Sequence, residues 1–167
     1  SSGLFDVPTL AAHCVAVSDD DINILAKYGV RVAHNPGSNM KLASGVAPVE
    51  KMLAAGIAVG LGTDGAASNN NLDMVEEMRL AGLLHKVTRL DPTAVPAHAC
   101  LEMATSGGAA CLGLADRIGS IEIGKRADIV LLDFGAPHLS PAGIADLMSH
   151  VVYSASGADV SAVVVDG

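Results

Sequence analysis

Three polar side chains of types that can carry out hydrolysis each stand at the end of an apolar segment. These are His13, His34 and Asp64. In barrels of alternating strands and helices, the reacting groups sit at the carboxyl ends of the strands. Neighbouring parallel strands lie about 5 Å apart, so we expect the three side chains to converge on one rim. A carboxylate there can take a proton from water while an imidazole steadies the attacking oxygen.

Each of these residues also has a structural interpretation when it is taken alone. A histidine at a strand end can be a hydrogen bonder of the fold, and an aspartate can be a turn residue or a cap. The run GLGTDG at residues 60–65 also satisfies the pattern G-x-G-x-x-G of dinucleotide-binding loops. That pattern should lead directly into a helix, whereas a polar loop is expected after residue 65. The grouping of three strand ends is therefore a better indication of a site for chemistry than any single motif.

The segments that must position these groups alternate between strand and helix. The strands carry apolar residues on both faces, which is typical of parallel strands buried between layers. Ser18 and Asp21 form a capping-box pattern at the start of the first helix. The expected segments are strands at residues 9–15, 30–33 and 57–61, with helices at residues 18–28 and 48–55. This order, with short connections, predicts an α/β fold with parallel strands and right-handed crossovers.

Helices are expected to dominate the next part of the chain. A polar loop is expected at residues 66–71, followed by a long amphipathic helix at residues 72–86. Asp91 and Pro92 have the pattern of an N-cap and a first helical residue, and we expect that helix to run to residue 105. Two glycines then break it before a short alanine-rich helix.

The pattern changes near residue 113, where we place a domain boundary. Residues 1–113 are expected to form the α/β part, and residues 114–167 a small, incomplete β domain. Short β-type segments with a Gly-Lys turn lie at residues 118–133, and a further strand is expected at residues 161–166. That strand has nothing after it to pair with, so we expect the chain to be a piece of a longer protein.

Composition limits the classes of function. The net charge of −8 and the absence of tryptophan indicate no nucleic-acid partner. No apolar run is long enough to span a bilayer, and no signal peptide is recognisable, so no membrane role is expected. Cys14, Cys100 and Cys111 match no zinc-finger or disulfide framework and are expected to be buried thiols in a reducing cytoplasm.

Three segments carry a resemblance to a known family. They read AAHCV at residues 11–15, VAHNPGSNMKLASG at residues 32–45 and GLGTDGAASNNNLDMVEEMRLAGLLHK at residues 60–86. Together they resemble the amidohydrolase superfamily, and are most similar to 5-methylthioadenosine/S-adenosylhomocysteine deaminases and the related chlorohydrolase and cytosine-deaminase branch. Two later runs, beginning at Pro96 and Val151, resemble the C-terminal region of the same family.

The resemblance implies the C-terminal part, strands six to eight, of a metal-dependent (β/α)₈ TIM barrel plus part of a small β domain. Asp64, after strand eight, would be a metal ligand and proton shuttle. His13, after strand six, would hydrogen-bond the reacting centre. The residues expected to line the substrate site after strand seven are His34, Asn35, Ser38 and Asn39.

The resemblance also implies a cofactor, a substrate and a reaction. The cofactor would be Zn²⁺, or another divalent metal such as Fe²⁺. A zinc-bound hydroxide would attack the amino-bearing carbon of a 6-aminopurine nucleoside, and ammonia would leave. Other reactions of the superfamily stay open, namely triazine dechlorination and the deamination of guanine or cytosine.

Several residues that the family brings to its metal are not in this sequence. Family members carry an H-x-H pair on strand one and a histidine on strand five, and neither is found here. A catalytic zinc needs at least three protein ligands, so we expect this chain alone to bind no zinc and to be inactive. The missing half would have to come from another chain or from a longer protein. A non-catalytic fragment that self-associates into a homo-oligomer through open strand edges is the other possibility.

Overall fold

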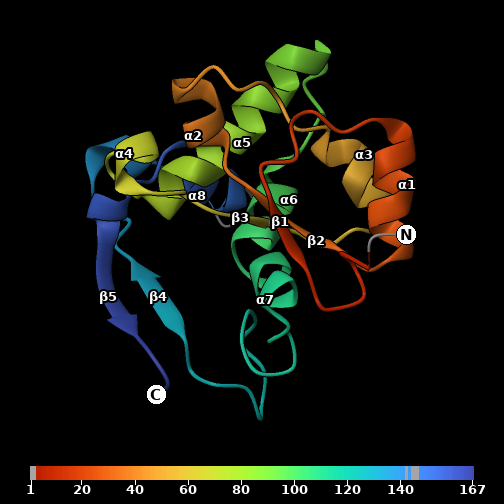
Figure 1. Cartoon of the computed structure of the whole chain (residues 1–167). Coiled ribbons are helices and arrows are strands. Elements are labelled where there is room, and N and C mark those ends of the chain that lie inside the picture. Colours follow the sequence, from red (N-terminus) through yellow and green to blue (C-terminus); the bar gives the residue numbers. More distant parts are fainter. Residues whose placement is uncertain (1–2, 142, 144–146) are drawn as a thin grey trace.

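A computed structural model describes residues 3–141, 143 and 147–167 of the chain (Figure 1). A three-stranded parallel sheet lies among helices, and a two-stranded antiparallel sheet extends from them at the lower left of Figure 1. The strands are β1 (Leu10–Ala12), β2 (Arg31–His34), β3 (Val59–Leu61), β4 (Ile129–Leu132) and β5 (Val160–Val164). The helices are α1 (Asp19–Lys27), α2 (Pro36–Lys41), α3 (Val49–Ala54), α4 (Ala66–Asn69), α5 (Met74–Arg89), α6 (Ala97–Ala104), α7 (Ser106–Leu112) and α8 (Leu147–Tyr153).

The parallel sheet has the order β1-β2-β3, so strands that are consecutive in the chain are neighbours in space. Its register sets Ala12, Ala33 and Gly60 side by side, and the three strands therefore end at one edge. The N–H of His13 continues the ladder beyond β1 by donating to the carbonyl of Ala33 at 2.9 Å. The α/β prediction with parallel strands is confirmed.

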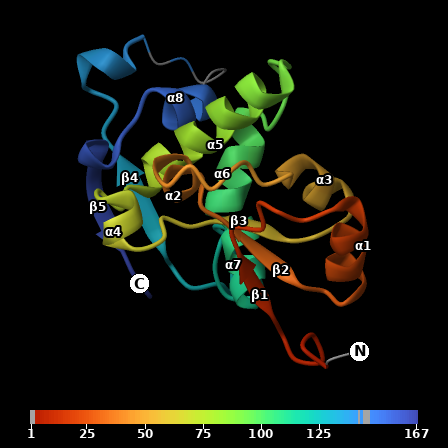
Figure 2. The same cartoon turned by 45° about the horizontal axis from the view of Figure 1, so that its top comes forward.

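The helices pack around this sheet in two groups. Helices α1 and α3 contact each other and lie at the right in both views, while α5, α6 and α8 pack together on the other side (Figures 1 and 2). Helix α7 packs against β2 and β3. A Cβ on Gly60 of β3 would lie 2.9 Å from the Cα of Gly108 in α7, so only glycine permits this close approach.

The capping pattern of α1 forms as the sequence predicts. Ser18 is the N-cap, and its hydroxyl accepts a hydrogen bond from the N–H of Asp21 while the Asp21 carboxylate accepts from the N–H of Ser18. The helix ends at Lys27 with Tyr28 as its C-cap, and Gly29 follows with φ +62°, a left-handed conformation that glycine adopts without strain.

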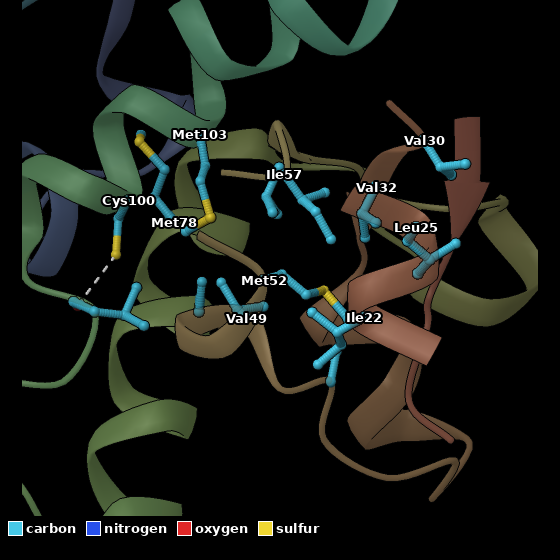
Figure 3. Close-up of a cluster of buried hydrophobic side chains, with 14 of the residues drawn as sticks. Ile22, Leu25, Val30, Val32, Val49, Met52, Ile57, Met78, Cys100 and Met103 are labelled. Carbon is cyan, nitrogen blue, oxygen red and sulfur yellow. Dashed lines mark hydrogen bonds between the residues drawn. The ribbon is translucent and has the colours of Figure 1, made fainter. Parts of the chain in front are cut away.

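One hydrophobic core fills the space between the sheet and the helices (Figure 3). Met52 of α3 is its largest fully buried side chain, and Val32, Val49 and Cys100 are likewise inaccessible to solvent. Burial of apolar surface contributes about 25 cal/mol per Å². Because the buried cluster contains residues of β2, β3, α5 and α6, its packing holds the parallel sheet against these two helices.

The first strand is shorter and less buried than predicted. The expectation of a buried strand over residues 9–15 is wrong, because β1 stops at Ala12 and Leu10 is 45% exposed. His13 and Cys14 have φ values of +65° and +49°, which no strand can contain. β1 is also an edge strand of the sheet, as β3 is, so one of its sides has no neighbouring strand among the described residues.

Two short helices occupy segments that were expected to be turns or loops. The expected loop at residues 66–71 contains the one-turn helix α4, and α2 follows β2 directly. Pro36 stands at the first position of α2, where its fixed φ suits a helix and its missing N–H costs nothing.

The prediction that a helix starts at Asp91 and Pro92 is wrong. Asp91 instead closes a turn, in which its carboxylate accepts from the N–H of Thr93 at 2.8 Å. Helix α6 begins only after Pro96. A proline lacks the N–H that a helix interior needs, so Pro96 could not lie within the predicted helix. The helix does break close to the predicted place, since α6 ends at Ala104 and α7 begins at Ser106, but the break is at Thr105 and the two glycines lie inside α7.

The last strand has a partner within the chain. β5 pairs antiparallel with β4, with Ile129 opposite Val164, so its partner is an earlier segment of the chain and not one that follows it. Of residues 118–133, only β4 is a strand, and the predicted turn is seen where Lys125 N–H donates to the carbonyl of Glu122. Among the described residues, no helix is long and apolar enough to cross a membrane.

Candidate functional site

The polar contacts at the carboxyl edge of the sheet meet at one oxygen atom, Oδ2 of Asp64. The hydroxyls of Ser38 and Ser68 each donate a hydrogen bond to it, both at 2.7 Å. These hydrogen bonds lower the pKa of Asp64 to about 2. The bond from Ser38 contributes most, followed by the bond from Ser68 and a backbone bond from Gly65. The side chain is 34% exposed. At neutral pH Asp64 is thus an ionised carboxylate that solvent can reach and that can accept a proton or bind a cation.

His13 faces the same carboxylate. Its Nε2 atom lies 3.8 Å from Oδ2 of Asp64, and its Nδ1 atom lies 2.7 Å from Oδ1 of Asn39. An amide oxygen can only accept, so Nδ1 carries the proton and Nε2 of the neutral ring keeps its lone pair. Asn35 Nδ2 makes a longer contact with Nδ1, at 3.5 Å. Asn39 therefore fixes the ring so that its free nitrogen is directed towards Asp64.

Left-handed backbone conformations turn both side chains onto the edge. The φ values of His13 and Asp64 are +65° and +61°. For residues other than glycine such conformations cost of order 1–3 kcal/mol and persist only where the surroundings enforce them. Here the sheet ladder on one side and the start of α4 on the other hold the chain. Strain at two facing residues is typical of a functional site.

Helix α2 supplies buried polar groups beneath these two residues. Asn35 caps its start, and Ser38 and Asn39 lie in its first turns, all three with at most 4% of their surface exposed. A Cβ on Gly62 would collide with the Asn35 side chain, so glycine leaves room for the amide. The Nδ2 atom of Asn39 is buried and has no hydrogen-bond partner among the residues described.

His34 points away from this cluster into the interior. Its side chain is fully buried, and its Nε2 atom lies 3.2 Å from Nε2 of His85 on α5. Burial lowers the pKa of His34 to about 3 and that of His85 to about 4. The structure therefore brings His13 and Asp64 together from the three strand ends, along with Asn35, Ser38 and Asn39, and places His34 against α5.

Sequence reasoning did not single out Ser68, Glu77 and His85. Ser68 lies four residues after Asp64, and only the unexpected helix α4 brings its hydroxyl back to the carboxylate. Glu77 and His85 stand on the buried face of α5 with Ala81 between them at the same spacing of four. Two polar residues on the otherwise apolar face of a long helix were the sequence signal that could have identified Glu77 and His85.

The described residues do not by themselves fit a complete zinc site. Among them no group of three or more histidine, cysteine, aspartate or glutamate side chains could hold a metal ion. A catalytic zinc takes three protein ligands and one water. The chain offers the carboxylate of Asp64, so any metal at this edge needs further ligands from other residues.

Comparison with known sequences gives a consistent result over the whole chain. The model of the amidohydrolase family matches residues 1–167. The chain is 64% identical over 166 residues to a 5-methylthioadenosine/S-adenosylhomocysteine deaminase of Desulforudis audaxviator, which covers 99% of the chain and 38% of that relative. It is 57% identical over 167 residues to the protein of the same name from Pelotomaculum thermopropionicum, covering 100% of the chain and 38% of the relative. The chain thus spans about two fifths of the length of these relatives.

Solved structures show the same similarity in three dimensions. The chain superposes on an adenosine deaminase from Xanthomonas campestris with bound zinc at a TM-score of 0.90 and 42% identity, covering 95% of this chain and 36% of that one. It superposes on an atrazine chlorohydrolase from Arthrobacter aurescens TC1, complexed with zinc, at a TM-score of 0.84 and 34% identity. That match covers 95% of this chain and 35% of the chlorohydrolase. For a guanine deaminase from E. coli the TM-score is 0.85 and the identity 26%, and the match covers 95% of this chain and 37% of that one.

Proposed function

The chain belongs to the amidohydrolase family, and from that premise we propose that it is the C-terminal part of a metal-dependent hydrolase that deaminates a 6-aminopurine nucleoside. The substrate is 5-methylthioadenosine or S-adenosylhomocysteine, as in the names of relatives up to 64% identical. The observation that carries the proposal is the pairing of an ionised, solvent-accessible Asp64 with His13 across 3.8 Å.

The reaction balances with these two side chains as acid–base groups. Water adds through its oxygen to the ring carbon that bears the amino group, and Asp64 accepts the proton that the water loses. The proton then passes to the amino group, the bond between carbon and nitrogen breaks and ammonia leaves. The remaining hydroxyl proton moves to the adjacent ring nitrogen, which gives a 6-oxopurine. Nε2 of His13 is directed at the same space and hydrogen-bonds the attacking oxygen.

The proposed cofactor is Zn²⁺, or another divalent metal such as Fe²⁺, because related structures contain zinc. A bound divalent metal lowers the pKa of water to about 7. Asp64 would be one ligand, and the others would come from residues outside this chain. We propose accordingly that the isolated chain neither holds the metal nor turns over substrate.

The same comparison supports a proposal for the complete fold. A TIM barrel would have β1, β2 and β3 as its strands six, seven and eight, and its active site at their carboxyl edge. Residues 1–113 would be the barrel part, and residues 114–167 part of a small β domain. The missing strands would come from the rest of a longer protein or from another chain, and a homo-oligomer is one such arrangement.

The residues proposed to line the substrate site are Asn35, Ser38 and Asn39, with His34 behind them. Asn39 supports this role because its buried Nδ2 donor has no partner among the described residues. A nucleoside nitrogen or hydroxyl is a suitable acceptor for such a donor. The cytoplasm is the proposed location, in keeping with the free thiols of Cys14, Cys100 and Cys111.

A second reaction of the same chemical class has structural support. The similarity to an atrazine chlorohydrolase suggests displacement of chloride from a triazine ring by water. The same carboxylate and imidazole would serve it, since both reactions replace a substituent on an electron-poor ring carbon.

The test is an assay of the full-length enzyme that carries this chain. We expect ammonia release from 5-methylthioadenosine and S-adenosylhomocysteine, with lower kcat/KM for guanine and no chloride release from atrazine. Asp64→Asn should lower kcat by about 100-fold or more, the range for loss of a general acid–base group. Wild-type kcat in D64N, or faster turnover of atrazine, would overturn the proposal. The 167-residue chain assayed alone with zinc should release no ammonia.

A further inference from the structure

Glu77 is a buried carboxylate that the proposed reaction does not use. It lies on α5, is 1% exposed, and accepts two hydrogen bonds. Its Oε2 atom accepts from the N–H of Gly37 at 3.0 Å, and its Oε1 atom accepts from Nδ2 of Asn69 at 2.7 Å. Gly37 belongs to α2 and Asn69 to α4. One side chain thus links two helices that flank the candidate site.

The residues next to these two partners are the ones that hold Asp64. Ser38 follows Gly37 in α2, and Ser68 precedes Asn69 in α4. Both serine hydroxyls donate to Oδ2 of Asp64 at 2.7 Å. The hydrogen bonds to Glu77 and those to Asp64 are therefore one residue apart in each helix, so a shift at Glu77 reaches both serines.

The packing around Glu77 leaves little room for adjustment. A Cβ on Gly37 would collide with Oε1 of Glu77 and lie 3.0 Å from Nδ2 of Asn69. Asn69 is held on its other side too, because its Oδ1 atom accepts from the N–H of Leu72 at 2.9 Å. The two donors are thereby fixed on the carboxylate.

We propose that Glu77 is a positioning residue for Asp64, which sets the separation of α2 and α4 and through it the placement of the hydroxyls of Ser38 and Ser68. Glu77 touches neither substrate nor reacting atoms and acts only through these serines. The kinetic part of this inference rests on the proposed function, and the structural part does not.

The kinetic test compares Glu77→Gln with Glu76→Gln in the full-length enzyme. Glutamine has the size of glutamate but turns an NH₂ group towards one of the two N–H donors. Misplacement of a catalytic group by about 1 Å can cost 100-fold in rate, so E77Q should lower kcat by about 10- to 100-fold with KM changed less than about twofold. Glu76 precedes it on the same helix and contacts Asn71 instead, so E76Q should keep wild-type kcat. Equal kcat in E77Q and wild type would overturn the proposal.

A double-mutant cycle separates positioning from general damage. If Glu77 acts through the serines, E77Q should cost little further kcat, less than about threefold, in a Ser38→Ala/Ser68→Ala background, since groups that act together are not additive. The full E77Q loss in that background would contradict the proposal. Should E77Q not fold, Asn69→Ala removes the α4 contact to Glu77, together with the bond from the Leu72 N–H, and should lower kcat in wild type but not in Ser68→Ala.

A measurement without catalysis keeps the two proposals distinguishable. Hydrogen–deuterium exchange of peptides covering α2 and α4 should rise in E77Q relative to wild type and E76Q. Unchanged exchange in both peptides would overturn the positioning role. Raised exchange in an enzyme that releases no ammonia from any aminopurine nucleoside would reject the proposed function and leave the Glu77 contacts supported.

Discussion

The Nε2 atoms of His34 and His85 lie 3.2 Å apart in the interior, with neither ring open to solvent. One Nε2 must donate and the other accept, so the two neutral rings share a single proton across this contact. His34 ends β2 and His85 lies on α5, so the pair joins the sheet to the longest helix.

This histidine pair should make the protein less stable in mild acid. In the unfolded chain both rings take up protons below about pH 6.5, whereas burial holds the folded pKa values at about 3 and about 4. Between pH 6.5 and 4 the unfolded state binds more protons, so the free energy of unfolding falls as the pH falls. The limiting slope is about 1.4 kcal/mol per pH unit for each ring.

His85→Gln should reduce that dependence on pH. The amide keeps a polar partner for His34 but does not titrate, so the slope between pH 6.5 and 4 should fall by up to about 1.4 kcal/mol per pH unit. Urea unfolding at several pH values measures it. His98→Gln is the control, because His98 is exposed on α6. A slope in H85Q equal to that of wild type would contradict this account.

Ser38→Ala and Ser68→Ala should each lower kcat of the full-length enzyme by about tenfold. Each removes one of the two hydroxyl hydrogen bonds to Asp64, and bonds to ionised groups are about twice as strong as neutral ones. Loss of about 1.4 kcal/mol in the transition state gives that factor. Steady-state assays measure kcat, with Ser44→Ala, an exposed serine, as control. If S38A and S68A matched S44A, the two hydroxyls would have no part in holding the carboxylate.

Met52→Ala should lower the free energy of unfolding by about 2–5 kcal/mol, the usual cost of a cavity left by a large core side chain. Met52 is fully buried among the side chains of Figure 3. Met148→Ala on α8 is the matched control, since Met148 is 53% exposed, and should change stability by less than about 0.5 kcal/mol. Denaturant unfolding distinguishes the two, and similar losses in both variants would argue against the core described here.

Ser18→Ala should lower the free energy of unfolding by about 1 kcal/mol, the typical cost of losing an N-cap hydroxyl. The N–H of Asp21 loses its acceptor, and the reciprocal bond from the Ser18 N–H remains. Thermal unfolding followed by circular dichroism measures the change. A Tm that does not move would mean that water replaces the cap at no cost.

The sequence allowed the strand ends to be predicted but not the direction of each side chain. Alternating apolar segments placed His13, His34 and Asp64 at one edge, because parallel strands in a regular order must end together. His34 turned inward because of His85, 51 residues later in the chain, and no local pattern contains that pairing. The left-handed backbone at His13 and Asp64 likewise had no signal in the surrounding sequence pattern.

Short helices and helix beginnings were harder to predict than strands. α2 and α4 have six and four residues, too few for a hydrophobic period to be recognised. Both helices instead make tertiary contacts that no local pattern contains, among them those with Glu77, which lies on another helix. For α6, Asp91 and Pro92 had the pattern of a helix start, but Pro96 excludes a helix that runs through it, and α6 begins only after Pro96.

The hydrogen bonds of Glu77 bear on the order in which the site can form while the chain is being synthesised on the ribosome. A growing chain synthesised as far as Asn71 already contains Asp64 and both serines that hold it. It does not yet contain Glu77, which ties α2 to α4. If Glu77 positions Asp64 as we propose, the carboxylate of Asp64 reaches its final geometry only after α5 has been synthesised and has docked against α2 and α4.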